Sequence, residues 1–134
     1  VWPDKTYHVE NVGDRNNASL VLLMKYGETS ILFTGDAEEE SEVDFVSDLG
    51  DIDVLKVGHH GSLTSTSWTL LEVIQPEIAL LSVWKGNSYG HPHPAILDRL
   101  LEWGSVIYRT DLSGDILLTS YGMEPSVQVS PLPF

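Results

Sequence analysis

The sequence contains no cysteine, few basic residues and no long apolar run. The absence of cysteine excludes disulfide bonds, thiolate zinc sites and cysteine nucleophiles. No apolar segment reaches the roughly 18 residues that a membrane-spanning helix needs, and Val1–Asp4 show no sign of a signal peptide. A glycine-rich phosphate loop and a basic aromatic stripe are also missing. These absences direct attention to the carboxylates and histidines.

Acidic residues greatly outnumber basic ones. The 134 residues include 20 Asp and Glu against 7 Lys and Arg, which gives a formal net charge of -13. Such a surface repels phosphate backbones at long range and disfavours non-specific binding of nucleic acid by the chain alone. One acidic segment is expected to form the solvated face of a helix. Its members are Glu38, Glu39, Glu40, Glu42, Asp44 and Asp48.

The length and the hydrophobic fraction of 42% suit a single domain, 1–134, with a sizeable core. Strands are predicted at 20–26, 30–34, 53–57, 77–83, 105–109 and 115–120, and helices at 37–49, 68–74 and 95–103. The resulting order, β-β-α-β-α-β-α-β-β, is typical of an α/β layered fold. We expect the first strand to be buried, Val43 to lie on the apolar face of its helix, and 123–134 to form a loose tail or an edge segment.

Four of the five histidines form two tight clusters that follow predicted strands, His59 with His60 and His91 with His93. Each cluster lies in a loop among glycines or prolines, and α/β folds place ligand sites at strand ends. A lone histidine favours a structural role, and the isolated His8 is expected at the surface. Two pairs at strand ends favour a metal or catalytic role.

Asp36 is the third element of the candidate site. It follows Thr34 and Gly35 at the end of an apolar strand. Glycine permits a sharp turn there that would project the carboxylate from the edge of the sheet. The alternative is that Asp36 caps the N-terminus of the acidic helix, and the two roles do not exclude each other.

A carboxylate with several imidazoles suits zinc or manganese. Hydrolysis at such a site requires a metal-bound water of lowered pKa and an open coordination position. The competing scheme is a serine triad, in which Ser62 or Ser65 acts with His59 and Asp36. The sequence has no Gly-x-Ser-x-Gly elbow, which argues against the triad.

Four segments together resemble the metallo-β-lactamase-like domain of the ComEC competence protein family. In chain order they are Asn16–Leu23, Phe33–Glu38, Val54–Ser62 and Tyr89–Pro94, and Arg109-Thr110-Asp111 before Gly114 adds to the likeness. The resemblance covers 16–118, and the combination of HHGS with YGHPHP is its most specific part.

The resemblance implies the C-terminal half of an αββα sandwich, a mixed sheet with flanking helices and a metal site at its edge. Asp36 matches an aspartate that bridges two zinc or manganese ions in the superfamily. His59 and His91 are assigned as further metal ligands, and His60 and His93 as catalytic residues. The alternative places ligands at His60 and His91 and leaves His93 to orient its neighbours.

The chain departs from the superfamily in one respect, because no His-x-His-x-Asp-His run occurs in it. We therefore expect a piece of a longer bacterial inner-membrane protein, a soluble domain on its outer face, that cannot complete a two-metal site alone and is inactive by itself. The expected partners are the N-terminal half of the same domain and DNA. An uncovered apolar sheet face would also permit a homodimer.

Three functions are compatible with these features. The resemblance implies a phosphodiesterase or nuclease that acts in DNA uptake during competence. The second is a soluble hydrolase of the same superfamily that cleaves a small ester, lactone or phosphodiester. The third is a non-catalytic interaction module of the competence machinery.

Overall fold

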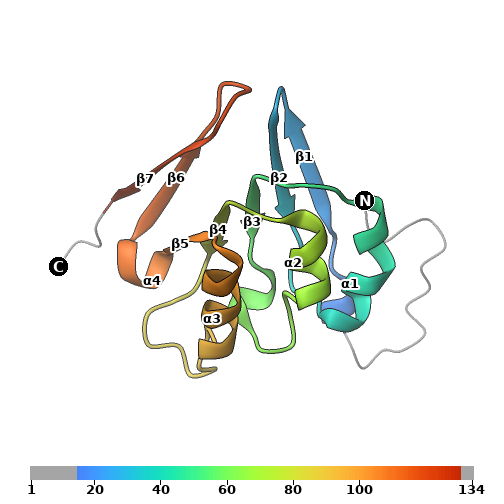
Figure 1. Ribbon diagram of the computed structural model, residues 1–134. Helices are drawn as coiled ribbons and strands as arrows, with labels where there is room; N and C mark the ends of the chain where they lie inside the picture. Colours follow the sequence, from blue (N-terminus) through green and yellow to red (C-terminus); the bar gives the residue numbers. More distant parts are fainter. Residues whose placement is uncertain (1–14, 131–134) are drawn as a thin grey trace.

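The computed structural model describes residues 15–130, and its main feature is a five-stranded sheet with the order β1-β2-β3-β4-β5 (Figure 1). The first pair of strands is antiparallel and the other three pairs are parallel, so the sheet is mixed as predicted. Its strands are β1 (Leu22–Tyr26), β2 (Thr29–Phe33), β3 (Val54–Lys56), β4 (Ile78–Leu81) and β5 (Val106–Arg109). The predictions for Val1–Asp4 and His8 lie outside the described residues.

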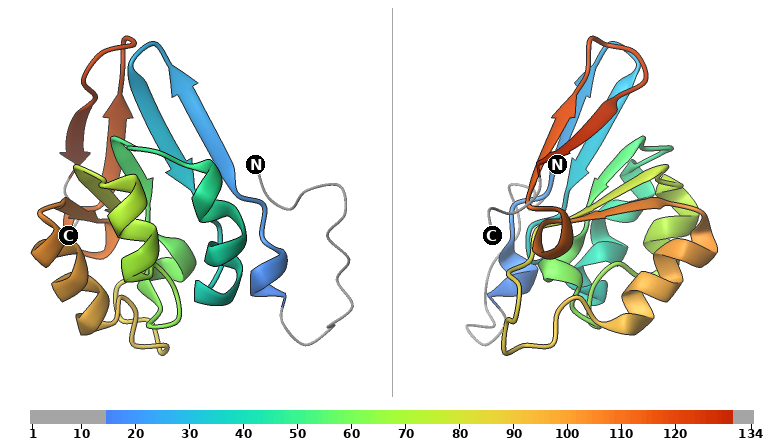
Figure 2. Two further views of the ribbon diagram at one scale, coloured as in Figure 1. Left: turned by 45° about the vertical axis from the view of Figure 1, so that its right-hand side comes forward. Right: turned by 90° about the vertical axis from the view of Figure 1, so that its left-hand side faces the viewer.

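Three helices cover one face of this sheet (Figure 2). They are α1 (Glu39–Phe45), α2 (Trp68–Ile74) and α3 (Pro94–Trp103), followed by the short α4 (Thr110–Ser113). Three 3-10 turns complete the helical elements: η1 (Asn16–Ala18), η2 (Val46–Asp48) and η3 (Gly58–Gly61). The arrangement agrees with the predicted α/β fold and with one half of an αββα sandwich. Within residues 15–130, no helix is long and apolar enough to cross a membrane.

The core lies between the sheet and these helices. Leu32, Leu55 and Ala79 are in register on neighbouring strands, and all three are fully buried. Leu71 of α2 and Leu100 of α3 belong to the same buried cluster. This continuous apolar layer holds the parallel strands in place, and so fixes where their carboxyl ends lie.

The prediction of a buried first strand is wrong for most of its length. Val21 is fully buried, but Leu22, Met24 and Tyr26 are 49%, 45% and 59% exposed. The reason is that β1 is an edge strand, and the described residues do not cover the side chains on this face. A run of apolar residues predicts a strand but does not distinguish an edge from an interior position.

The acidic helix also differs from the prediction of a uniformly solvated acidic face. Glu42 is 1% exposed, whereas Val43, expected on the apolar face, is 61% exposed. The carboxylate of Glu42 accepts hydrogen bonds from the backbone N–H groups of Thr66 (2.6 Å) and Ser67 (2.8 Å). These two bonds hold α1 in a rotation that turns Glu42 inward, and the predicted 37–49 helix shortens to α1 and η2.

A second sheet consists of β6 (Asp115–Thr119) and β7 (Ser126–Ser130), which pair antiparallel. Residues 126–130 of the segment 123–134, expected as a loose tail or an edge segment, therefore form a strand. The tip of this hairpin meets the tip of the β1–β2 hairpin (Figure 1). There the N–H of Glu28 donates to the carbonyl oxygen of Gly122 at 2.9 Å.

Candidate functional site

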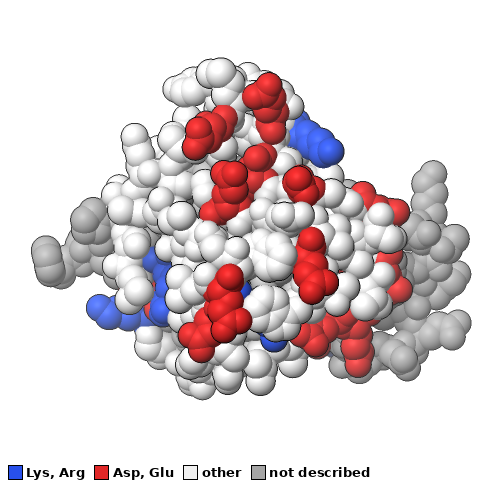
Figure 3. Space-filling model, viewed as in Figure 1, with Lys and Arg blue, Asp and Glu red and all other residues white. Residues whose placement is uncertain are grey.

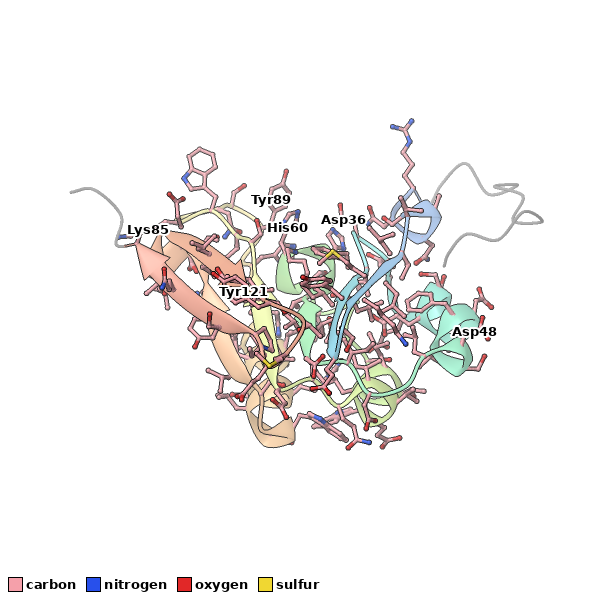
Figure 4. The ribbon with its side chains drawn as sticks, turned by 90° about the horizontal axis from the view of Figure 1, so that it is seen from above. Asp36, Asp48, His60, Lys85, Tyr89 and Tyr121 are labelled. Carbon is pink, nitrogen blue, oxygen red and sulfur yellow. The ribbon has the colours of Figure 1, made fainter. Side chains whose placement is uncertain are left out.

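The candidate site lies at the carboxyl ends of adjacent parallel strands. Asp36 follows β2, His59 and His60 lie in η3 after β3, and His91 lies in the loop between β4 and α3. Parallel strands bring their carboxyl ends to one edge of a sheet, where α/β folds bind ligands. Figure 4 shows Asp36, His60 and Tyr89 in a row along one side of the molecule.

A tight turn presents Asp36. Gly35 has a φ of 59°, and a Cβ there would lie 3.0 Å from the Cβ of Ser19. The N–H of Asp36 donates to the hydroxyl of Ser19 at 3.0 Å. The N-cap position of α1 is occupied by Glu38, so the alternative capping role for Asp36 is wrong. The Asp36 carboxylate is therefore available for other interactions.

Two glycines allow the histidine turn to dock between the other loops. A Cβ on Gly58 would lie 3.0 Å from the hydroxyl oxygen of Thr34, and a Cβ on Gly61 would lie 2.6 Å from the Cβ of Pro92. Between them, His59 and His60 have φ values of 43° and 56°. Non-glycine residues in this left-handed region are uncommon and cluster at functional sites.

Hydrogen bonding fixes the proton on the His60 ring. Its Nδ1 lies 2.7 Å from the carbonyl oxygen of Ser82, and because a carbonyl only accepts, Nδ1 carries the proton. Nε2 lies 3.7 Å from Oδ1 of Asp36, which is too long for a direct hydrogen bond. In neutral His60 two electron-pair donors therefore face each other, an arrangement that suits a shared cation.

His59 is oriented by a carboxylate that the sequence analysis placed on the solvated helix face. Its Nδ1 lies 3.1 Å from Oε1 of Glu38. The same oxygen accepts from the hydroxyl of Thr64 at 2.8 Å and from the side-chain amide of Asn16 at 3.2 Å. Nε2 of His59 is left as the free ring nitrogen, as in carboxylate–histidine pairs that bind metals. The sequence signal for this role was that Glu38 lies only two residues after Asp36 and before α1 begins.

The second histidine cluster separates into two environments. The ring of His91 lies 5.7 Å from that of His59 and is stacked on Tyr89, with 5.9 Å between centroids. Desolvation and the neighbouring imidazoles hold the pKa of His91 below its ordinary value. His93 instead caps α3, because its Nδ1 accepts the N–H of Ala95 at 3.2 Å. A catalytic role for His93 stays a prediction.

The sequence analysis missed a half-buried lysine next to the site. Lys56 ends β3, and its Nζ donates to the carbonyl oxygen of Val57 at 2.9 Å. Burial lowers the pKa of Lys56, and the negative charge of Asp36 acts in the opposite direction. A lysine inside an otherwise apolar strand was the available signal.

The serine triad has no support in the geometry. Ser65 is fully buried, and its hydroxyl donates to the carbonyl oxygens of Gly58 and Ser62. The hydroxyl of Ser62 pairs with that of Thr64 at 3.1 Å. Both hydroxyls thus serve the loop, and no hydrogen bond described for them reaches a histidine.

The donors present fit only part of a metal site. Carboxylate oxygen and imidazole nitrogen are suitable ligands for zinc or manganese, and Nδ1 protonation leaves Nε2 of His59 and His60 free. Asp36 and His60 form a close pair. Among residues 15–130, however, no three His, Asp or Glu side chains lie close enough to hold an ion.

A pocket of about 450 Å³ opens next to these donors. This volume lies within the range typical of small-molecule sites. Its lining combines histidines of the candidate site with the loop that follows β4: His60, Ser82, Val83, Trp84, Asn87, Tyr89, His91 and Thr110.

Comparisons with known proteins match the chain to one superfamily and to several competence-related proteins. Residues 9–83, which include Asp36, His59 and His60, match the family model of the metallo-beta-lactamase superfamily. Recombination protein 2 of Haemophilus influenzae is 44% identical over 101 residues, which are 75% of this chain and 13% of that protein. ComE operon protein 3 of Bacillus subtilis is 43% identical over 104 residues (76% and 13%). Competence protein ComA of Neisseria gonorrhoeae is 39% identical over 104 residues (75% and 15%).

Proposed function

Because the chain belongs to the metallo-beta-lactamase superfamily, we propose that it supplies one side of a metal-dependent phosphodiesterase site that acts on DNA during competence. One observation carries the proposal: Asp36 and His60 face each other at adjacent strand ends, with the His60 Nδ1 proton held by Ser82. The likeness to competence proteins supports the biological setting.

The proposed metal is zinc or manganese, which when bound supplies a water molecule of lowered pKa. Asp36 and Nε2 of His59, His60 or His91 are the proposed donors. The remaining ligands would come from another segment of the same protein, since the chain spans only 13% to 15% of the relatives' length.

The proposed substrate is a phosphodiester because a lysine and two metal-ligating imidazoles lie next to Asp36. Lys56 lies close enough to Asp36 for the carboxylate to favour the charged form of the lysine, against the effect of burial. The Nε2 atoms of His59 and His60 can ligate the metal. Such groups stabilise the charge that develops on phosphate oxygens during cleavage.

One acidic surface of the molecule faces away from the candidate site. Figure 3 shows carboxylates scattered over the helix-covered face, with few basic side chains among them. The row of Asp36, His60 and Tyr89 lies on the side away from α2 and α3 (Figure 4). We propose that the DNA strand approaches from that side, where repulsion by the helix face is weakest.

The test is a chimera of the gonococcal competence protein ComA in which this chain replaces the matching segment. The readout is transformation frequency in the host organism. The unaltered chimera is expected to support transformation, and Asp36→Ala is expected to lower it at least about tenfold. Asp48→Ala is the matched control, because Asp48 is exposed and lies far from His60 (Figure 4).

Equal transformation by the Asp36→Ala and Asp48→Ala chimeras would contradict the proposal. If the two variants transformed equally but deletion of the segment abolished transformation, the chain would be a non-catalytic interaction module. If the chain instead cleaved small esters or lactones and supported no transformation, the alternative hydrolase function would replace the proposed one.

A further inference from the structure

The pocket next to the candidate metal donors has an aromatic rim. Trp84 is 82% exposed and Tyr89 is 81% exposed, and both lie in the loop between β4 and α3. Aromatic rings are enriched where proteins bind other molecules. Two such rings around one pocket indicate that the pocket receives a ligand with a flat apolar surface.

One side chain closes the loop that carries these rings. The amide nitrogen of Asn87 donates to the carbonyl oxygens of Trp84 (3.0 Å) and His91 (2.6 Å). Its amide oxygen accepts the N–H groups of Tyr89 (3.2 Å) and His91 (3.0 Å). The rim is therefore held in place before any ligand arrives, which lowers the entropy lost on binding.

Two polar groups of the pocket wall already have hydrogen-bond partners within the protein. The hydroxyl of Thr110 bonds both the N–H and the carbonyl of Val83, each at 2.8 Å. The Nδ1 of His60 bonds the carbonyl of Ser82. The rim itself offers ring faces, extended by the stacking of Tyr89 on His91. Such a surface holds a planar ligand without reading its edge.

We propose that this pocket binds a nucleobase next to the scissile phosphate, by stacking on Trp84 and Tyr89 and with little preference among bases. The position of the phosphate rests on the proposed function. His60 lines the pocket and also faces Asp36, so a phosphate bound through a metal at these two donors would bring an adjoining base to the rim. Stacking tolerates every base because each has a π face.

The experiment titrates the ¹⁵N-labelled 134-residue chain with short single strands of about ten nucleotides, a typical site size. The buffer contains EDTA and moderate salt. One strand is oligothymidine and the other is an abasic strand with the same number of phosphates. The indole N–H resonance of Trp84 should shift with oligothymidine but not with the abasic strand. The resonance of Trp68, which packs against Arg99 on the helix face, should stay in place.

Variants assign the effect to the rim. Trp84→Ala and Tyr89→Ala should each weaken oligothymidine binding about tenfold, the usual loss for one stacked base. Both residues are highly exposed, so the fold should tolerate the changes. Tyr121→Ala is the matched control because Tyr121 is also 81% exposed but does not line the pocket. Oligoadenosine should bind within a few-fold of oligothymidine.

Three results would overturn the pocket proposal: equal shifts with the abasic strand, unchanged affinity in both rim variants, or no Trp84 shift up to about 1 mM oligothymidine. No metal and no cleavage enter this experiment, so its failure leaves the phosphodiesterase proposal standing. Conversely, if the chimera failed to support transformation, the phosphodiesterase proposal would fail, but a base-dependent shift of Trp84 would still support the pocket proposal.

Discussion

The carboxylate of Glu38 lies 3.1 Å from Nδ1 of His59 and thereby fixes which ring nitrogen of His59 faces the site. Asn16 and Thr64 hold the same carboxylate oxygen, so Glu38 is itself restrained. From the sequence, Glu38 is one of several acids predicted on a solvated helix. In the structure it connects η1, the turn after β2 and the histidine turn. The orientation of His59 therefore depends on contacts between segments far apart in the chain.

The first prediction is that Glu38→Ala changes the tautomer of His59. In the unaltered chain Nδ1 should carry the proton, because a carboxylate only accepts. Loss of Glu38 should let the ring populate the Nε2–H tautomer. Two-bond ¹H–¹⁵N correlation spectra of the histidine rings distinguish the two forms. Glu40→Ala is the control, since Glu40 is exposed in the first turn of α1. An identical His59 pattern in both variants would refute the role of Glu38.

The second prediction concerns the contact between the two histidine loops. In Gly61→Ala the new Cβ would lie 2.6 Å from Pro92 Cβ and 2.9 Å from Leu81 Cδ2, at a φ of 83°. The combined overpacking and backbone strain should lower the free energy of unfolding by about 3 kcal/mol, measured by urea denaturation. Gly86→Ala is the matched control, because its φ is 73° and no atom lies within 4 Å of the added Cβ.

The control variant should lose about 1 kcal/mol, from the left-handed backbone alone. The difference between the two variants is the part that reports close packing of Gly61 against the His91–His93 loop. Equal destabilisation by Gly61→Ala and Gly86→Ala would mean that the loops separate without penalty. Close packing of Gly61 against Pro92 would then not be what brings the two histidine clusters together.

The third prediction is a pH dependence of stability that arises at Glu42. Desolvation raises the pKa of Glu42 above its ordinary value of 4.5, and the hydrogen bonds from Ser67 and Thr66 offset only part of that effect. Above pH 4.5 the folded state thus binds this proton more tightly than the unfolded state. The contribution of Glu42 to the unfolding free energy is then full below pH 4.5 and is lost as pH rises through the folded pKa.

Glu42→Gln should remove this dependence. Urea denaturation at a series of pH values from 4 upward should show the unaltered chain losing stability relative to the Gln variant as the pH rises. Glu40→Gln, at an exposed position of α1, should run parallel to the unaltered chain and so corrects for the general effect of the -13 net charge. Parallel curves for Glu42→Gln would contradict the raised pKa.

Local sequence patterns predicted the features of the fold that follow from the order of strands and helices along the chain. The strand ends that carry Asp36, His59 and His60 were predicted, because parallel strands must share an edge. The rotation of α1 was not, since it is set by two backbone N–H groups of Thr66 and Ser67 that lie 24 and 25 residues away from Glu42. The exposure of β1 likewise depends on which neighbours a strand has, and no residue in 20–26 encodes that.

The aromatic pocket illustrates the same limit. Trp84 and Tyr89 belong to a loop without periodicity, so the sequence predicted neither their exposure nor their approach to His60. Their position follows from Asn87, whose amide satisfies four backbone groups of the loop. It also follows from Thr110 of α4, which bonds the backbone of Val83 just after β4. A loop of this kind is specified by individual hydrogen bonds.

The last prediction is that the purified 134-residue chain shows negligible DNA cleavage with zinc or manganese. Within residues 15–130 no three potential ligands converge, and a catalytic metal in proteins generally has about three protein ligands and an open position. Zinc should bind weakly, through Asp36 and His60. Calorimetry of zinc binding and cleavage of a labelled single strand are the two measurements.

Variants of the same chain separate the two ligand assignments. If Asp36 and His60 form the pair, then Asp36→Ala and His60→Ala should each weaken zinc binding, while His93→Ala should not, because its Nδ1 is used to cap α3. Loss of binding in His59→Ala with retention in His60→Ala would instead favour the assignment of His59. Strong metal-dependent cleavage by the chain alone, lost in Asp36→Ala, would show that its own donors suffice, and the proposal of ligands from another segment would then be wrong.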